Sequence, residues 1–460
     1  MHLRKDYLKV AKKLREILKL EERISKGEKL DPKQLEKIAA KGALLKEVTV
    51  LAVKLPGDTD IFSKNQDITD LLPPASQRDI EKKRKQEEEK KQRRNERQEE
   101  ENNKPEFMCR HDRPILAVCV SSDGRHLFTC SKDKYAICWS LAKTLLKSVV
   151  TFAGHNGAVW AVDVCPPSPL VPAWLATGSA DGKVMLWQGE PGRHGAGAIA
   201  SPLHTLDHGG IVRVLKWCPF EDYQASSDGG RRLASASEKL GSTPAMIAVW
   251  HVSPKGVFTQ IMQNKDIPTK ANDLQWGNGA KQKLFTAHDN GFVGVWLAES
   301  PGSLLKTIKV HSAAISALCL TMGGTTLVTA SKDSTSAAVD VSQPSTETLA
   351  TYKWNRPLNA VAVSADFKAG AAGTIVVAGG KDARDVTRAK DMQEDEFESK
   401  VMEAASGEPL AAGKGHFGPV HALLSLPRLG SSGAFASVSE DGCLKVFGYD
   451  GLLLHSDTLQ

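Results

Sequence analysis

Hydrophobic residues follow two different patterns along the chain, and the change comes near residue 105. In the N-terminal part, apolar side chains recur close to a seven-residue a/d spacing with basic residues between them, which predicts an amphipathic helix over residues 2–25. Asp31-Pro32 then supplies an N-cap followed by proline at the first helical position. A second helix is predicted from there to about Val48, so residues 1–50 are expected to form a basic α-helical hairpin.

Residues 51–104 show neither helical nor strand periodicity over most of their length. The segment 54–75 has the Pro, Gly and Asp content of a linker. Residues 76–103 contain ten basic and nine acidic side chains but one large apolar residue, so they have almost nothing to bury. We expect a Pro/Gly linker followed by a charged spacer, which is either an isolated helix with i,i+4 ion pairs or a disordered tether.

From residue 105 onward, short β-rich runs alternate with turn residues, and one unit occurs seven times. The clearest copy reads GHNGAVWAVDVCPPSPLVPAWLATGSADGKVMLW and spans residues 154–187. The other six copies begin at His111, His208, Thr269, His311, Asn355 and Gly415. Each unit offers three apolar strands and a fourth that leads into the next unit. Such a blade cannot bury both faces of its sheet alone, so neighbouring blades must stack until the ring closes.

The repeat resembles the WD-repeat family, which places a His near the start of each unit, a Ser/Thr-x-Asp turn, and a Trp on the third strand. In the second unit these positions are held by His155, Ser179, Asp181 and Trp187. The matching His and Asp pairs of later units are His311 with Asp333 and His416 with Asp441. The resemblance implies that these side chains form a structural hydrogen-bond network.

The fold implied by this resemblance is all-β, a seven-bladed WD-repeat β-propeller over residues 105–455, preceded by the α-helical hairpin and the charged helical or disordered linker. In this family the first strand of the domain usually completes the last blade. Here Glu106–Cys109 is in position to do so beside Gly442–Phe447.

The His, Ser and Asp residues of the repeat also suggest a hydrolase, because they are the side chains of a catalytic triad. Catalysis needs one assembled site, however, whereas this set recurs with variations in most units. No P-loop, GxSxG or HExxH motif occurs in the sequence. The eight cysteines are scattered without a Cys-x-x-Cys pair, so we expect free buried thiols rather than zinc ligands. The sequence therefore predicts no enzyme, no catalytic residues, no metal and no cofactor.

Several local sequences are more specific than the repeat itself. They include RPILAVCVSSDGRHLFTCSKD (113–133), TASKDSTSAAVDVS (329–342), RPLNAVAVS (356–364), GGKDARDVT (379–387) and GHFGP (415–419). These sequences resemble the family of subunit i of eukaryotic translation initiation factor 3 over nearly all of residues 106–450. A second family, that of the serine-threonine kinase receptor-associated protein, shares the GH-x-GAVW region but lacks the paired DVT and GHFGP motifs. That second resemblance implies an adaptor in signalling or RNA-complex assembly.

The first resemblance implies a non-catalytic scaffold that docks a helix of subunit b and a segment of subunit g and helps the factor sit on the small ribosomal subunit. In this family the helix-binding face lies over blades five and six, at positions that match Val339 and Asp340. Asp340 would pair with a basic residue of the partner helix, and Val339 would supply apolar burial. The alternative for Asp340 is the ordinary strand-end Asp of a WD repeat. Residues 1–104 are an addition to the family pattern, and the C-terminal DGLLLHSDTLQ differs from its aromatic, acidic tail.

The net charge of +6 is concentrated at the N-terminus, where residues 1–48 hold 14 Lys/Arg and 8 Asp/Glu. Any attraction to RNA or the ribosome is therefore expected in residues 1–48, and a solvated coiled coil without a ligand is the alternative. The N-terminus has no continuous apolar run typical of a signal peptide, and no window holds the roughly 18 apolar residues of a spanning helix. We expect a cytoplasmic protein that does not contact membranes.

Two irregular stretches remain. GEPGRHGAGAIAS (189–201) is predicted to be a surface loop of the second unit. GGKDARDVTRAKDMQEDEF (379–397) holds five acidic side chains from Asp385 to Glu396, but no His or Cys stands at metal-ligand spacing from them. We expect this acidic run to be an exposed connection of the sixth unit rather than a carboxylate site.

Overall fold

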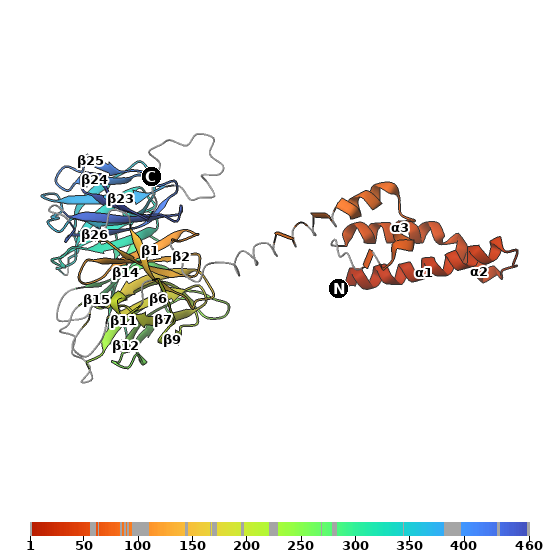
Figure 1. The fold of residues 1–460 in the computed structure, drawn as a ribbon, viewed down its shortest axis with the longest axis horizontal. Coiled ribbons are helices and arrows are strands. Elements are labelled where there is room, and N and C mark those ends of the chain that lie inside the picture. The colour runs from red at the N-terminus through yellow and green to blue at the C-terminus, as the bar shows by residue number, and fades with distance from the viewer. Residues whose placement is uncertain are drawn as a thin grey trace. The chain divides into compact units, whose positions relative to one another are not determined.

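The computed structural model describes residues 2–55, 61–62, 64–82, 85–86, 89, 92–93, 110–142, 146–165, 167, 173–194, 197–219, 229–267, 269–277, 283–343, 345–380, 397–429 and 433–457. The chain divides into two compact units, Met1–Pro105 and Glu106–Gln460. The described part of the first unit is helical, and strands dominate the second (Figure 1). Each unit has a hydrophobic core of its own.

The N-terminal unit begins with three helices. These are α1 (His2–Ser25), α2 (Pro32–Ala39) and α3 (Lys41–Lys54). Asp31 and Gln34 form the capping box at the start of α2. The Asp31 side chain accepts a hydrogen bond from the Gln34 N–H at 2.8 Å, and the Gln34 side chain accepts the Asp31 N–H at 3.1 Å. Two backbone N–H groups that a helix start leaves unpaired are thus satisfied, which is why the sequence locates this helix start correctly.

The second predicted helix is divided in two. Ala40 ends α2 with φ −75° and ψ −8°, which is close enough to helical geometry for α3 to begin at the next residue. The helical segment also continues to Lys54 instead of ending near Val48.

Residues 54–75, predicted as a linker, pack against the helices instead. Ile61, Phe62, Ile68 and Leu72 are all buried. The core that they join contains Tyr7, Val10, Ala11, Leu14, Val48, Ala52, Leu55 and Ile80. The linker prediction is wrong over this stretch, because these apolar residues cover the apolar stripe of α1. They are spaced too irregularly among polar residues to show a helical period in the sequence.

An ion pair fixes the short helix α5 (Gln66–Thr69) to α1. Arg15 donates to both carboxylate oxygens of Asp67 at 2.6 Å and to the side-chain oxygen of Asn65 at 2.8 Å. A bidentate pair of this kind fixes orientation as well as position. Residues 74–82 are again helical. Beyond them the predicted spacer is described only at 85–86, 89 and 92–93, all helical, so the choice between helix and tether otherwise lies outside the described residues.

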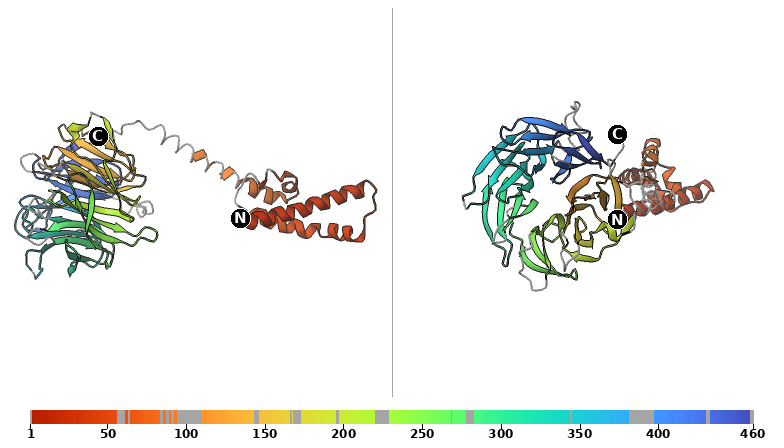
Figure 2. Two further views of the ribbon diagram at one scale, coloured as in Figure 1. Left: turned by 90° about the horizontal axis from the view of Figure 1, so that it is seen from below. Right: turned by 60° about the vertical axis from the view of Figure 1, so that its left-hand side comes forward.

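The described residues of the second unit form seven sheets that follow one another around a ring (Figure 2). Blade one contains β1 (Ile115–Val120), β2 (His126–Ser131), β3 (Ala136–Ser140) and β4 (Lys147–Phe152), and blade two contains β5 (Val159–Val164), β6 (Trp174–Ser179), β7 (Lys183–Gln188) and β9 (His204–Asp207). Blade three contains β10 (Ile211–Trp217), β11 (Arg231–Glu238), β12 (Met246–Val252) and β13 (Phe258–Asn264), and blade four contains β14 (Ala271–Gly277), β15 (Lys283–His288), β16 (Phe292–Leu297) and β17 (Leu304–Lys309). Blade five contains β18 (Ile315–Leu320), β19 (Thr326–Ser331), β20 (Thr335–Asp340) and β21 (Thr348–Lys353). Blade six contains β22 (Leu358–Val363), β23 (Thr374–Gly379), β24 (Ser399–Glu403) and β25 (Pro409–Gly413), and blade seven contains β26 (Val420–Leu426), β27 (Ala434–Ser439), β28 (Leu444–Gly448) and β29 (Leu453–Ser456). The predicted seven-bladed β-propeller is confirmed.

Polar side chains of the innermost strands join neighbouring blades. Asp163 of blade two accepts the main-chain N–H of Trp217 in blade three at 2.7 Å. Asp273 of blade four accepts the N–H of Leu318 in blade five at the same distance. Because each carboxylate bonds the backbone of the next inner strand, it fixes how far the two strands can slide past each other. The inner strands together line a central cavity of about 580 Å³.

The ring closes differently from the sequence prediction. The strand paired to the outer side of β28 is β29, so the fourth strand of blade seven comes from the C-terminal segment. β29 therefore occupies the place beside Gly442–Phe447 that the sequence prediction gave to Glu106–Cys109, and that prediction is corrected. Residues Glu106–Cys109 themselves lie outside the described residues. The apolar LLLHS, which departs from the family's usual tail, supplies the strand instead.

Blades seven and one meet through a shared core and several polar contacts. Leu146 donates its main-chain N–H to the Ser456 carbonyl at 2.8 Å, and Lys132 pairs with Glu440 at 3.1 Å. The apolar core between the two blades includes Ile115, Leu127, Trp139, Leu426, Val438 and Val446. Packing of whole sheet faces therefore closes the ring, supplemented by these polar contacts.

The insert GEPGRHGAGAIAS contains a strand rather than forming a simple surface loop. After a 3-10 turn at Pro191–Arg193, β8 (Ala198–Ala200) pairs in parallel with β4 and gives blade one a fifth strand. Ala200 is buried in the core between blades one and two. The surface-loop prediction is wrong because β8 is only three residues long and its partner belongs to another blade, so no local pattern reveals it.

The GGKDARDVT stretch begins at the end of β23 in blade six. A Cβ at Gly379 would collide with the carbonyl oxygen of Pro357, and Gly380 has φ +127°, so both glycines are required by the backbone. Residues 381–396, which include the acidic run, lie outside the described residues. Their expected role as an exposed connection stays a prediction.

Asp457 at the ring closure makes the stability of the propeller depend on pH. Its N–H donates to the Leu444 carbonyl at 3.2 Å, while both carboxylate oxygens are buried with no hydrogen-bond partner in the described structure. Burial raises the pKa of Asp457 to about 6. Because the folded-state pKa lies above the unfolded value, the destabilisation is absent below about pH 4 and complete above about pH 6.

The substitution Asp457→Asn should therefore raise the free energy of unfolding at pH 7.5 by about 1–3 kcal/mol. The gain should shrink as the pH falls and disappear below about pH 4, where the wild-type carboxyl becomes protonated in both states. Tryptophan fluorescence during urea unfolding measures this, because all nine tryptophans lie in the propeller. A variant that is less stable at pH 7.5, or a difference that does not change with pH, would contradict the assignment.

Candidate functional site

The four residues singled out in blade two are connected by one buried network. His155 Nδ1 lies 2.9 Å from Asp181 Oδ2, and His155 Nε2 lies 2.8 Å from the hydroxyl oxygen of Thr177. Trp187 donates its indole N–H to the same hydroxyl at 2.8 Å. Ser179 accepts the Asp181 N–H at 3.2 Å and so supports the turn. The network joins the loop before β5 to both β6 and β7.

Thr177, the centre of this network, was missed by the sequence interpretation. It lies two residues before Ser179 on β6, so the two side chains share one face of the strand. The signal that identifies it is a Ser or Thr near the end of the second strand, two positions before the last residue in five blades and three positions before it in blade three. These hydroxyl residues are Thr129, Thr177, Ser235, Thr286, Thr329 and Ser437.

Blades one and seven repeat the arrangement. In blade one, the ring nitrogens of His111 lie 2.7 Å from Asp133 and 2.8 Å from Thr129, and Trp139 donates to Thr129 at 2.7 Å. In blade seven, the nitrogens of His416 lie 3.0 Å from Asp441 and 2.8 Å from Ser437. Blade one thus repeats the full contact between loop, second strand and third strand. Blade seven repeats only its His–Asp–Ser part, because Phe447, whose side chain has no N–H, holds the tryptophan position.

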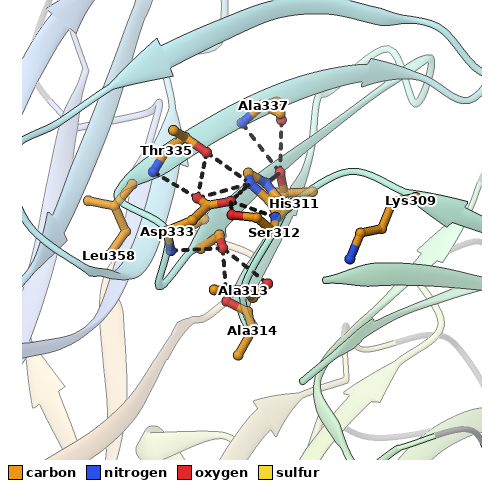
Figure 3. Close-up of polar contacts among 12 residues, drawn as sticks. Lys309, His311, Ser312, Ala313, Ala314, Asp333, Thr335, Ala337 and Leu358 are labelled. Atoms are coloured by element: carbon orange, nitrogen blue, oxygen red, sulfur yellow. Dashed lines mark hydrogen bonds and ion pairs between the residues drawn. The ribbon is translucent and has the colours of Figure 1, made fainter. Parts of the chain in front are cut away.

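Blade five shows how the aspartate is held (Figure 3). His311 lies 2.6 Å from the Thr329 hydroxyl and 3.1 Å from Asp333 Oδ2. Asp333 also accepts the Thr335 hydroxyl at 2.6 Å and the Ser312 N–H at 2.9 Å. Burial alone would raise the pKa of Asp333, but these hydrogen bonds and the neighbouring His311 outweigh it and lower the pKa to about 2. Asp333 is therefore an ionised anchor for the turn.

Val339 occupies in blade five the position that Trp187 holds in blade two. Trp187 pairs across the sheet with Leu175, and Val339 pairs with the equivalent Leu327. The Val339 side chain is 1% exposed and lies in the core between blades four and five. The sequence interpretation gave it a direct partner contact, and that role is corrected because the side chain is not accessible.

Asp340, the next residue, is partly exposed at the end of β20. Its Oδ1 accepts the Ser342 hydroxyl at 2.6 Å and the Ser342 N–H at 2.8 Å, and these bonds lower the pKa of the carboxyl. Asp340 therefore presents a negative charge near neutral pH. These bonds also make it a turn-forming residue, so a partner contact by Asp340 stays a prediction.

Other blades depart from the full set. In blade three, His208 and Trp250 both contact the Ser235 hydroxyl at 2.9 Å, but His208 Nδ1 is buried without a partner and burial lowers the pKa of His208 to about 4. In blade four, the histidine is His288, which lies on β15 itself, 2.8 Å from Thr286. The hydrogen bonds of the histidine differ between blades while each of these blades keeps its four strands. Such variation is typical of contacts that support the fold.

The central cavity contains charges of both signs. Lys216, one of its lining residues, is partly buried, which by itself would lower its pKa, but Asp163 and Asp273 outweigh this and raise the pKa. Arg213, another lining residue, stacks over the Trp160 ring at 3.6 Å and pairs with Glu238 at 3.2 Å. Each of these cations is thus balanced by acidic groups of the same blade or of neighbouring blades.

The His–Asp pairs are closed to substrates. The histidine side chains of the four complete pairs are 0–2% exposed. Their second ring nitrogen already contacts a Ser or Thr hydroxyl, so the geometry supports holding strands together rather than accepting a proton from a bound molecule. Among the described residues, no three His, Cys, Asp or Glu side chains are grouped to hold a metal ion.

None of the described helices is both long and apolar enough to cross a membrane.

Known protein families and solved structures contain the same repeat. Residues 104–140, 146–188 and 302–335 match the family described as WD domain, G-beta repeat. In a search of solved structures, the chain is similar to the WD40 β-propeller domain of Doa1, with a TM-score of 0.53 and 17% identity over 73% of this chain and 93% of that one. This likeness shows the fold.

Several curated relatives carry the name eukaryotic translation initiation factor 3 subunit I. The protein of Culex quinquefasciatus is 29% identical over 348 residues, which is 75% of this chain and 97% of the relative. Those of Drosophila grimshawi and Drosophila melanogaster are 28% and 29% identical over 350 residues, with the same coverage. The chain thus contains almost the whole length of these relatives and an additional quarter of its own.

The hydroxyl of Thr177 should contribute strongly to stability. Thr177→Val keeps the shape but leaves His155 and the Trp187 indole N–H buried without their partner, so we expect a loss of about 2–4 kcal/mol in the free energy of unfolding. Thr177→Ser, which keeps the hydroxyl, should lose about 1 kcal/mol or less. Urea unfolding followed by tryptophan fluorescence measures both. Equal losses in the two variants would show that packing, and not the hydroxyl, is what matters.

Proposed function

We propose that the chain belongs to the family of subunit I of eukaryotic translation initiation factor 3, to whose members it is 28–29% identical over nearly their whole length, and that it is a non-catalytic scaffold subunit of this factor. Its propeller docks other subunits and supports assembly of the initiation complex on the small ribosomal subunit. This role places the protein in the cytoplasm.

The observation that carries this proposal is the extent of the match. The relative from Culex quinquefasciatus is matched over 97% of its length, which corresponds to a complete ring and not to a few shared repeats. Propellers host many functions, so a match limited to the repeat would support the fold alone. The GGKDARDVT and GHFGP segments add sequence that the general WD pattern does not require.

The exposed ring of Phe417 in the GHFGP segment supports a docking role. The main-chain N–H of Phe417 donates to Asp441 at 2.9 Å, so the buried network of blade seven fixes this backbone. The Phe417 side chain is nevertheless 84% exposed. Aromatic side chains are enriched at protein interfaces because they bury a large area with few rotatable bonds.

The burial of the His–Asp pairs supports the non-catalytic part of the proposal. Their polar atoms are engaged with each other and with strand hydroxyls, which leaves the outer surface of the propeller as the part available to partners. We assign a helix of subunit b to the face over blades five and six, and a segment of subunit g to the same propeller. Asp340 supplies a negative charge for a basic residue of that helix.

The N-terminal unit supplies a different contact. Its residues 1–48 carry the charge surplus of the whole chain, and the propeller relatives account for only 75% of the chain. We assign RNA or ribosome affinity to residues 1–48, because opposite charge is the attraction that such a surplus provides.

Affinity purification of the tagged full chain from its native cells tests the scaffold role. Mass spectrometry should recover other subunits of initiation factor 3, and the complex should sediment with small ribosomal subunits. Asp340→Lys should reduce recovery of the subunit b type at least tenfold while the propeller stays folded, because it places like charges together. Asp207→Lys, an exposed acidic strand-end residue of blade two, is the matched control and should leave recovery unchanged.

Recovery of kinase receptors or an RNA-assembly complex in place of initiation-factor subunits would contradict the scaffold role and favour the signalling or RNA-assembly adaptor. If both substitutions leave recovery unchanged, the contact assigned to Asp340 is wrong while the scaffold role stands.

A further inference from the structure

Four lysines form a basic face on α1, opposite its buried stripe. Lys5, Lys9, Lys12 and Lys19 are separated by four, three and seven residues, which are close to whole helical turns, so they lie on one side of the helix. All four are exposed. From the first to the last they span about 21 Å along a single rigid helix. We call this set the α1 lysine face.

The charge of the α1 lysine face is not neutralised within the described structure. Among the described residues of the unit, other basic side chains do form ion pairs. These pairs are Arg15–Asp67, Arg23–Glu28, Lys26–Glu22, Lys37–Glu16 and Lys41–Glu21. Glu16 lies between the lysines of the face, but it is the partner of Lys37 from α2. The helical unit therefore separates paired basic residues from a row of four unpaired lysines that only Glu16 interrupts.

We propose that the α1 lysine face binds the phosphate backbone of a structured RNA helix. A nucleic-acid duplex carries closely spaced negative charge along its axis, and a row of lysines on a straight helix can follow it. The inference deepens the proposed RNA contact of residues 1–48 and rests on it. It assigns that contact to one face and to phosphates.

The environment of α1 favours RNA over a membrane surface. A helix that lies in a membrane interface must insert an apolar face. On α1 that face is occupied, because Tyr7, Val10, Leu14 and Ile17 are all at most 4% exposed in the core of the unit. The helix therefore presents positive charge to a membrane surface but has no free apolar face to insert into it.

The composition of the face also favours a duplex backbone over a single strand or an acidic protein. Binding of single-stranded RNA relies on aromatic side chains that stack with bases, and protein interfaces are enriched in aromatic residues and Arg and depleted in Lys. The four positions of the face are all lysine. Backbone recognition of this kind carries little sequence information and depends strongly on salt.

The test compares two fourfold variants of the full chain that have equal net charge. The first replaces the α1 lysine face, K5Q/K9Q/K12Q/K19Q. The control replaces four exposed lysines elsewhere on the unit, K29Q/K33Q/K46Q/K54Q. Fluorescence anisotropy measures binding of each protein to a 20-base-pair RNA duplex of random sequence over a range of KCl concentrations. Glutamine is a good helix former, so α1 should remain helical by circular dichroism.

The first variant should lose about tenfold or more in affinity at low salt, and its log–log salt slope should fall by about three to four, one for nearly each lost phosphate contact. The control variant should keep most of the affinity and most of the salt slope. The charge-preserving variant K5R/K9R/K12R/K19R should bind like the wild type. Equal losses of affinity in the first variant and the control would show that net charge, and not the α1 lysine face, determines binding. No loss of affinity in either variant would overturn the RNA contact. Stronger binding to phosphatidylserine vesicles than to the duplex at equal salt would also overturn it.

The outcome is separable from the scaffold role. K5Q/K9Q/K12Q/K19Q should still recover initiation-factor subunits through its unchanged propeller. If the wild type bound the duplex through this face but recovered no such subunits, the scaffold role would fail and the α1 lysine face would stand.

Discussion

The buried hydroxyl on the second strand of six of the seven blades is the contact on which the propeller most depends. In blade two, Thr177 meets both His155 and the indole N–H of Trp187, so one oxygen joins the entry loop to the second and third strands. A buried polar group without a partner is costly, so any slip of these strands would break several bonds together. The register fixed in this way also sets the direction of the inner-strand side chains. That is how Asp163 reaches the backbone of the next blade and extends the order around the ring.

The same network determines where function can reside. It places the His and Asp side chains in the interior, where they hold strands, and leaves the surface of the ring to partners. The exposed Phe417 and the partly exposed Asp340 each follow directly from a buried network or core position, so their placement is as rigid as the blade. The helical unit has its own core and turns α1 outward as a charged surface. We infer a division of labour in which the propeller binds proteins and the helical unit binds RNA.

The sequence predicted the fold well because the repeat is strong and each copy supports the others. It missed features that depend on contacts between distant segments. The strand β8 is three residues long and pairs with β4 of another blade, so nothing near it in the sequence shows where it pairs. The strand β29 forms a local hairpin with β28, but the family pattern assigned its place to Glu106–Cys109. The apolar residues of 54–75 follow no helical period, yet they complete the core around α1. Thr177 looks like any strand threonine until its neighbours are in place. Val339 was misassigned because a valine in a motif does not reveal that it fills a buried tryptophan position.

Polysome profiling after depletion of the protein from its native cells tests the central claim most directly. If the propeller is a scaffold of translation initiation, depletion should move ribosomes from polysomes into free subunits and monosomes, and the full chain should restore the profile. The charge-altered K5Q/K9Q/K12Q/K19Q form should restore it less completely, because it keeps the propeller contacts and loses those to RNA. A polysome profile that is unchanged after effective depletion would contradict the account.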